Sequence, residues 1–456
     1  MIKHERRSGV LLPLFSLPGE YGIGTLGAGA RAFLDKISEA GFRLFQTLPF
    51  CPPDGFGSPY AGRSSFAGDP ALIDPGELCA SGLLRAEEAA ELRLPEDGPV
   101  DRGRWDVRWR LLATAAERCD TAPIEDFLHE NPETAEYCRL AAEREGGDLR
   151  THAFAQYEFF REWEALLAYA HVRGVSVVGD LPLYSAPGSY DTLAYPGAFL
   201  PSGVAGVPPD GFSADGQVWG NPLYDYAAMA EDGFSFLRAR LSFLLVRLDG
   251  VRLDHFRGYA GYYAIPEGCG AREGCWRPGP GQALLDALSD LLSDRLVIAE
   301  DLGIIDEGTE TLRCRNGLLS TRVFQFAFLG DPESPHLPSR LPTDAAVYSG
   351  THDNDTLASF LSSLSEGQTA AVRAECLAEE GEATGEAVLR TLLHSRAELA
   401  ILPFADLLLL GGEARINTPG RAEGNWQMRL TSAQLAALDT ERYLGLNRAA
   451  GRASEG

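Results

Sequence analysis

The strongest constraint on the fold of this chain is a series of eight short apolar runs, most of them separated by stretches with helical spacing. The runs are residues 10–15, 42–48, 175–180, 251–254, 296–300, 322–328, 345–350 and 414–417. The first two enclose a helical pattern at 26–41, which makes a strand–helix–strand unit. Eight such strands predict an α/β protein with a (β/α)8 TIM barrel. An open doubly wound sheet is the alternative, but no glycine-rich phosphate-binding motif follows the first run.

Two long stretches interrupt this alternation of strands and helices. Residues 71–155 are rich in Ala and Glu at helical spacing, and we interpret them as a helical insertion subdomain. Residues 181–233 contain many Gly and Pro and few branched apolar side chains, which predicts a loop insertion at the site without packed elements of its own. With both insertions included, residues 1–456 are expected to form a single catalytic barrel.

The acidic composition of the chain limits its partners. It has 40 Lys and Arg against 65 Asp and Glu, a net charge of −25, which repels nucleic acid and anionic lipid and favours a neutral ligand. Residues 1–10 contain no apolar segment of signal-peptide length. The longest apolar run, 401–410, is too short for a membrane span and contains Asp406. We therefore expect a cytoplasmic monomer or weak homodimer that binds neither nucleic acid nor membranes.

The eight cysteines are scattered and form no CxxC motif. In a long chain without a signal peptide this usage predicts reduced thiols. A bridge between Cys269 and Cys275, which flank a short loop, is the alternative. The sequence has no His and Cys cluster, and we expect neither a metal nor a cofactor.

Acidic residues follow four of the predicted strands. Asp180, Asp254, Glu300 and Asp353 lie at or after strand carboxyl ends, which converge on one pocket in a barrel. Several carboxylates in one pocket surrounded by aromatic loops indicate glycosidic-bond chemistry, and neighbouring strand ends can hold two of them about 5–5.5 Å apart. A Mg²⁺ or Ca²⁺ site is the alternative. Arg252 lies on the same strand face as Asp254, which argues against a cation there, although an isolated Arg–Asp pair is often structural.

Long loops rich in Gly, Pro and aromatic residues separate these strands. In the loop at 52–70, Ser58 offers a donor and Tyr60 a stacking surface. Trp219, within a Gly and Pro segment, predicts a stacking platform, with a tryptophan tucked into the core as the alternative. These loops predict the rim of a substrate pocket.

Seven stretches of the sequence resemble one enzyme family. They are SPYAGRSSFAGDP (58–70), GDLP (179–182), VAGVPPDGFSADGQVWGNPLY (204–224), RLDHFRGYAGYYAIP (252–266), AEDLG (299–303), GTHDNDT (350–356) and INTPGRAEGNW (416–426). In this order they resemble the 4-α-glucanotransferases called amylomaltases or disproportionating enzymes, relatives of the α-amylase clan. Met428 departs from the family pattern, since a Trp or another large side chain is expected there.

The resemblance implies a role for each of the three acids. Asp254 is the expected nucleophile of a covalent glycosyl-enzyme, and Glu300 the expected general acid and base. Asp353 is expected to bind sugar hydroxyls and to stabilise the oxocarbenium-like transition state. Arg252 should keep Asp254 ionised, whereas Glu300, near other carboxylates, should hold its proton longer.

The resemblance also implies how the substrate is bound. His255 and His352 are expected to hydrogen-bond hydroxyls beside the cleaved bond, although a lone His is more often a core residue. Asp180 is either a ligand of the sugar or a support of the pocket. The remaining expected contacts to α-1,4-glucans and to a glucose acceptor are Ser58, Tyr60, Trp219, Asn425 and Trp426. A hydrolase of the same clan is the alternative activity, and a barrel that has lost catalysis is disfavoured because all three acids are present.

Overall fold

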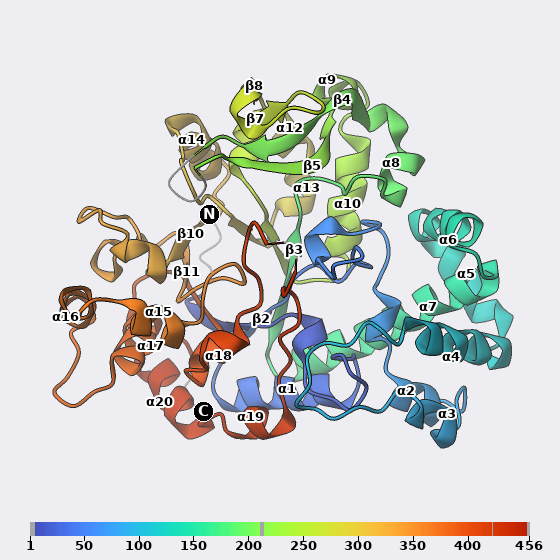
Figure 1. Ribbon diagram of the computed structural model, residues 1–456, viewed down its shortest axis with the longest axis horizontal. Coiled ribbons are helices and arrows are strands. Elements are labelled where there is room, and N and C mark those ends of the chain that lie inside the picture. Colours follow the sequence, from blue (N-terminus) through green and yellow to red (C-terminus); the bar gives the residue numbers. More distant parts are fainter. Residues whose placement is uncertain (1–4, 210–213, 422, 454–456) are drawn as a thin grey trace.

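The centre of the protein is a closed barrel of eight parallel strands, seen in a computed structural model that describes residues 5–209, 214–421 and 423–453 (Figure 1). The strands follow the order β1-β12-β11-β10-β9-β6-β3-β2 around the barrel. Their bounds are β1 Arg7–Leu11, β2 Leu44–Gln46, β3 Ser176–Leu181, β6 Gly250–Leu253, β9 Leu296–Ala299, β10 Leu319–Val323, β11 Ala345–Tyr348 and β12 Leu399–Pro403. The TIM barrel predicted from the sequence is confirmed.

The barrel closes because β1 pairs in parallel with strands from both ends of the series. Val10 lies opposite Phe45 of β2 on one side and Leu402 of β12 on the other. All three side chains are buried. Such burial on both faces explains why the strands are continuous apolar runs rather than alternating ones.

The eighth strand was predicted in the wrong place. Residues 414–417 are not a strand but a 3-10 turn, η8 (Gly412–Ala414), followed by an extended loop, and the barrel is completed by β12. The residues of β12 continue directly into helix α18 (Phe404–Leu407), so the apolar run has no internal break to distinguish strand from helix. The sixth run also differs, since β10 begins at Leu319 and residues Phe324–Phe328 form a 3-10 helix.

Helices surround the barrel and connect its strands (Figure 1). α1 (Ala28–Glu39) connects β1 to β2, and its apolar side chains Phe33, Leu34 and Ile37 are buried against the strands. The other helices after β3 are α8 (Tyr190–Ala194), α9 (Tyr226–Glu231), α10 (Ser235–Leu245), α11 (Arg257–Ala260), α12 (Gly281–Ala287), α13 (Ser289–Leu292), α14 (Glu307–Arg315), α15 (Leu357–Ser363), α16 (Glu366–Glu375), α17 (Thr384–His394), α19 (Ser432–Ala436) and α20 (Thr440–Ala449).

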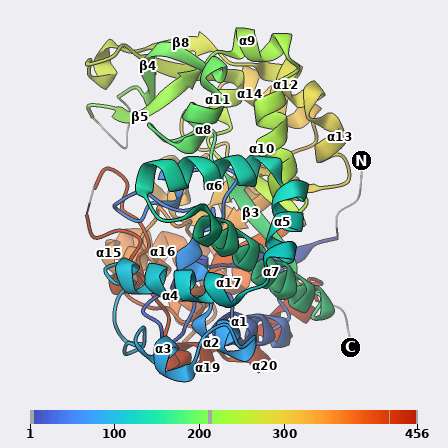
Figure 2. The ribbon, with the colours of Figure 1, turned by 90° about the vertical axis from the view of Figure 1, so that its right-hand side faces the viewer.

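The stretch 71–155 consists of helices joined by short loops. They are α2 (Pro75–Ala80), α3 (Ala86–Ala90), α4 (Trp105–Arg118), α5 (Thr121–Glu130), α6 (Pro132–Glu145) and the first turns of α7 (Leu149–Val172). Figure 2 shows α4 to α7 together on one flank of the molecule. α7 continues from this group along the outer wall of the barrel, where Trp163 donates to the carbonyl of Arg247. We propose that this group is the helical insertion of a single barrel domain.

A second, antiparallel sheet lies above the barrel in Figures 1 and 2, with the strand order β5-β4-β7-β8. Its strands are β4 (Phe199–Val207), β5 (Gln217–Tyr224), β7 (Gly261–Ile265) and β8 (Cys275–Pro278). The prediction that 181–233 lacks packed elements is therefore wrong. β4 and β5 have few apolar residues because most of their side chains remain partly exposed, and β4 is stabilised by pairing with β7 from a later part of the chain.

All eight cysteines are free thiols, including Cys269 and Cys275. Within the described ranges, no helix combines the length and the apolar character needed to cross a membrane.

Candidate active site

The acids of two neighbouring strands lie side by side at the carboxyl end of the barrel. β6 and β9 are hydrogen-bonded neighbours in which Leu253 lies opposite Ala299. The next residue of each strand is an acid, Asp254 after β6 and Glu300 after β9. Because parallel strands are about 4.8 Å apart, residues at equivalent register positions project from neighbouring points on the same face. The barrel therefore brings together the two carboxylates that the sequence placed on consecutive strands.

Arg252 lies between two carboxylates. Its Nη1 donates to Oδ2 of Asp180 at 2.6 Å and to Oδ1 of Asp254 at 3.0 Å. The side chain of Asp180 is fully buried and that of Asp254 is 26% exposed. Burial lowers the pKa of Arg252, but the two carboxylates outweigh it and raise that pKa well above its ordinary value. Arg252 is therefore a fixed cation that donates to both acids.

Glu300 keeps its proton to a higher pH than an ordinary carboxylic acid. Burial, reinforced by the charge of Asp254, raises the pKa of Glu300 to about 8. Its Oε2 accepts a hydrogen bond from the backbone N–H of His255 at 2.7 Å, which fixes the orientation of the carboxyl group. The Glu300 carboxyl therefore keeps its proton beside an acid that accepts from a fixed cation, an arrangement suited to acid-assisted displacement.

Asp353 projects from the loop after β11 and is held by residues of the segment 412–417. Asn417 Nδ2 donates to Oδ1 of Asp353 at 2.6 Å, and the Arg415 guanidinium donates to its backbone carbonyl at 3.0 Å. The Asp353 side chain remains 43% exposed. One carboxylate oxygen has a fixed partner, and the exposed remainder of the group is open to a ligand.

Three aromatic rings line the cleft beside Asp353. Tyr60 stacks on His352, with ring centroids 4.9 Å apart and planes inclined by 15°. Trp426 lies 6.0 Å from both rings. Burial lowers the pKa of His352, so its imidazole is neutral and can hydrogen-bond a hydroxyl. The Tyr60 hydroxyl donates to Asp180 at 2.8 Å, which connects this cluster to Arg252.

A second aromatic pair lies beside the turn that follows Asp254. Trp219 projects from β5 and meets the His255 ring edge to face, at 4.8 Å and 87°. Its Nε1 donates to Gln217 at 3.0 Å. Burial lowers the pKa of His255 to about 4, which keeps this imidazole neutral. His255 has a φ of 46°, a strained conformation for a residue other than Gly, of the kind found where a side chain is held for function.

A single cleft of about 1020 Å³ contains most of the predicted site residues. Those that line it are Ser58, Tyr60, Trp219, Arg252, Asp254, His255, Glu300, His352, Asp353 and Trp426. Asp180 lies behind this surface. Asn425 lies in the adjoining loop, where its amide bonds to the backbone of Thr418 and Arg421. Met428 is buried away from the cleft lining. The motif segments at 210–213 and 422 lie outside the described residues.

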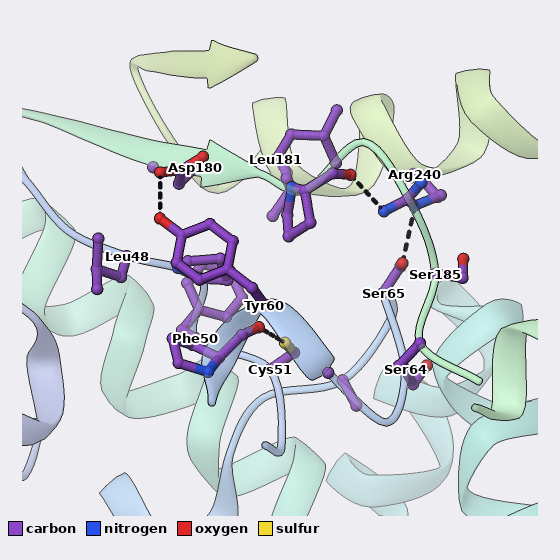
Figure 3. A pocket seen from close by; sticks show the side chains of 18 of the residues that line it. Leu48, Phe50, Cys51, Tyr60, Ser64, Ser65, Asp180, Leu181, Ser185 and Arg240 are labelled. Carbon is purple, nitrogen blue, oxygen red and sulfur yellow. Dashed lines mark hydrogen bonds between the residues drawn. The ribbon is translucent and has the colours of Figure 1, made fainter. Parts of the chain in front are cut away.

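A small cavity of about 40 Å³ lies behind the cleft (Figure 3). Tyr60 and Asp180 form part of its wall, and Arg240 bonds to Ser65 and to the backbone of Leu183 nearby. Burial raises the pKa of Asp180 to about 7, and its Oδ1 has no hydrogen-bond partner among the described residues. Asp180 therefore acts as a buried support for Tyr60 and Arg252 rather than as a surface of the cleft.

Sequence reasoning missed several residues that line the cleft. Gln325, Arg257, Trp276 and Asn417 are among them. Asn417 belongs to a motif that was recognised, but its contact with Asp353 crosses 64 positions of the chain and had no local signal. Trp276 lies on β8, which the sequence indicated only as part of an aromatic loop.

The chain is similar in sequence to proteins of one described activity. The sequence family described as 4-alpha-glucanotransferase matches residues 12–143 and 129–435. A 4-alpha-glucanotransferase of Thermus thermophilus is 38% identical, over 94% of this chain and 96% of the relative. One from Aquifex aeolicus is 37% identical, over 93% and 95% of the two chains.

A solved structure extends the similarity to the fold. The amylomaltase from Streptococcus agalactiae, solved in complex with acarbose, superposes with a TM-score of 0.94 at 29% identity. The superposition covers 99% of this chain and all of that one.

Proposed function

Because the chain belongs to the 4-alpha-glucanotransferase family, whose members transfer segments of α-1,4-glucan, we propose that Asp254, Glu300 and Asp353 perform this transfer by a retaining double displacement. The family and activity predicted from the sequence are confirmed, and the hydrolase alternative is not favoured. The observation that carries the assignment of residues is the register of β6 and β9, which sets Asp254 beside Glu300.

In the first step, the Asp254 carboxylate attacks the anomeric carbon while the Glu300 carboxyl gives its proton to the glycosidic oxygen. Arg252 donates to the Asp254 carboxylate and holds it in place, and burial favours a protonated Glu300. The bond to the leaving chain breaks as the bond to Asp254 forms, which leaves a covalent glycosyl-enzyme.

In the second step, the 4-hydroxyl of an acceptor sugar replaces the leaving chain. Glu300, now ionised, takes the hydroxyl proton as the oxygen attacks the anomeric carbon, and Asp254 leaves. Two inversions give net retention. Asp353 binds hydroxyls of the reacting sugar, and the neutral His255 and His352 add hydrogen bonds that do not compete for the proton.

Transfer rather than hydrolysis requires that a sugar reaches the intermediate before water. The aromatic surfaces of Tyr60, Trp219 and Trp426 favour a sugar ring over water because they offer apolar area. We propose that they bind glucose units of the donor and the acceptor, with free glucose as one acceptor. Eight free thiols fit a cytoplasmic location, and the charge of −25 fits a partner that is neither nucleic acid nor an anionic membrane.

The experiment that tests the function is incubation of the purified protein with maltotriose. We expect glucose together with a ladder of maltodextrins longer than the substrate, all linked in the α configuration. Products limited to glucose and maltose, without lengthening, would show a hydrolase instead.

A further inference from the structure

An exposed tryptophan lies in the cleft at a place that the proposed mechanism does not use. Trp276 of β8 is 42% exposed, and it lines the same cleft as Asp254 and Glu300. A large aromatic side chain gains stability when it is buried, so an indole left open within a ligand cleft calls for a ligand. The position of Trp276 therefore makes its indole part of the surface that faces a bound substrate.

The Trp276 indole is held in a fixed orientation. The Arg257 guanidinium lies over the ring, 4.2 Å from its centroid, and the Tyr263 ring meets it edge to face at 5.4 Å. Arg257 is in turn fixed by Asp306, whose Oδ2 accepts from Nη2 at 2.9 Å. The cation–π contact with Arg257 and the ion pair between Arg257 and Asp306 restrict the motion of the indole. The indole is therefore a rigid surface on which a ligand can stack.

Trp276 lies apart from Trp219, at the opposite edge of the antiparallel sheet. The two tryptophans project from β8 and β5, the outer strands of the antiparallel sheet. Trp219 touches His255, the residue after the nucleophile, whereas Trp276 touches Arg257, two residues further on. Arg257 and Asp306 come from the loops that follow Asp254 and Glu300, so the platform is tied to both acid-bearing strands.

The lining of the cleft that contains Trp276 fits a neutral sugar. Ile304 and Leu329 line the same cleft with 73% and 63% of their surface exposed, and Gln217 offers an amide. The C–H groups on a glucose ring face are apolar and electropositive and match the negative face of an indole, while the hydroxyls at the ring edge require polar partners.

We propose that Trp276 forms an outer subsite, in which its indole stacks on a glucose unit of an α-1,4-glucan beyond the units at the reacting bond. This inference rests on the proposed function and deepens it. A longer donor or acceptor reaches the platform and gains binding energy there, so Trp276 sets a preference for chain length. Arg257 and Asp306 are positioning residues for the platform.

The test compares two substrates with wild type and three variants. For Trp276→Ala, the ratio of kcat/KM for maltoheptaose to kcat/KM for maltotriose should fall about tenfold, the effect of losing one aromatic contact. Most of the change should lie in the KM for maltoheptaose. Trp276→Phe, which keeps an aromatic face, should restore most of the ratio. Trp105→Ala is the matched control, because Trp105 is 39% exposed but lies outside the cleft lining, and its ratio should equal that of wild type.

The outcomes separate this proposal from the function on which it rests. An unchanged ratio in Trp276→Ala, or an equal loss with both substrates, would overturn the outer subsite while transfer by the wild type stands. Absence of transfer in the wild type would overturn the function itself. Thermal unfolding of each variant shows whether an equal loss comes from misfolding. In that case Trp276→Leu, which fills much of the same space without an aromatic face, replaces Trp276→Ala, and an unchanged ratio in it would overturn the outer subsite.

Discussion

The backbone N–H of His255 donates a hydrogen bond of 2.7 Å to Oε2 of Glu300. His255 follows Asp254 directly, so the bond fixes the proposed acid and base relative to the proposed nucleophile through a single peptide unit. The backbone of His255 adopts a positive φ to make this arrangement. A hydrogen bond to a backbone donor cannot be removed by changing the donor's side chain, which makes the geometry of the two acids robust to substitution at His255.

Replacement of Asp254 by Asn should abolish transfer and leave the fold intact. Asn keeps the shape and an oxygen that accepts from Arg252, but it cannot form the glycosyl ester, so kcat should fall by more than about 10³-fold. The measurement is the initial rate with maltotriose, alongside maltoheptaose binding by calorimetry. Substantial residual activity would show that the nucleophile is another residue.

The pH dependence of activity should be set on its alkaline side by Glu300. Its folded pKa is raised from 4.5 to about 8 by burial and by Asp254, and the first step requires the protonated form. Activity should therefore decline as the pH rises through about 8, which a profile of kcat/KM for maltotriose checks. A decline that already begins near pH 5 would contradict the assignment.

The raised pKa of Glu300 should also make the free energy of unfolding depend on pH. Between the unfolded pKa near 4.5 and the folded pKa of about 8, the folded state binds more protons at Glu300 than the unfolded state. The stability from this group is therefore complete below pH 4.5 and is lost as the pH rises to about 8. Glu300→Gln, which has no proton to lose, should unfold in urea with a weaker dependence on pH over this range than wild type.

Arg252→Met should destabilise the fold and lower the activity. The substitution leaves the fully buried Asp180 without its cation, and removal of one partner from a buried ion pair costs about 3–5 kcal/mol. Urea unfolding at pH 7 measures the loss. The double variant Arg252→Met with Asp180→Asn removes both charges and should regain part of the stability. If the double variant is less stable than the single one by the full cost of Asp180→Asn alone, the two residues are independent.

Asn417→Ala should lower kcat more than it raises KM. Asn417 holds one oxygen of Asp353 at 2.6 Å, and a misplaced Asp353 loses contacts in the transition state at a cost of about tenfold in rate. Kinetics with maltotriose separate the two constants. Asn316→Ala is the control, because the Asn316 amide donates to Gln282 and to the carbonyl of Leu312 and lies outside the cleft lining. A change in KM alone for Asn417→Ala would mean that Asn417 contacts the substrate directly.

Chelation should leave the activity unchanged. Across the described residues, no group of three or more His, Cys, Asp or Glu side chains is arranged to hold a metal ion, and Arg252 occupies the space beside Asp254. The activity with maltotriose should be equal before and after dialysis against EDTA. A loss that added Ca²⁺ or Mg²⁺ restores would require a metal in the protein.

The sequence predicted the barrel and the acids because both depend on local signals. A strand that ends in an acid can be recognised from a few residues, and convergence follows from the topology of the barrel. The eighth strand was misplaced because β12 runs into α18 without a break. β4 and β5 were missed because they contain few apolar residues and because the pairing of β4 with β7 is not encoded locally. Asn417 reaches Asp353 across 64 positions of the chain, a contact that one sequence does not reveal.

The pairing of β1 with β12 has a consequence for how the protein folds during its synthesis. Arg7 lies opposite Leu399, and the Arg452 side chain donates to the carbonyls of both Arg7 and Glu398. A ribosome therefore has to synthesise almost all of the described chain before the first strand can meet its second neighbour. Until then β1 has an open edge, which puts the nascent chain at risk of aggregation and makes it a candidate for chaperone protection.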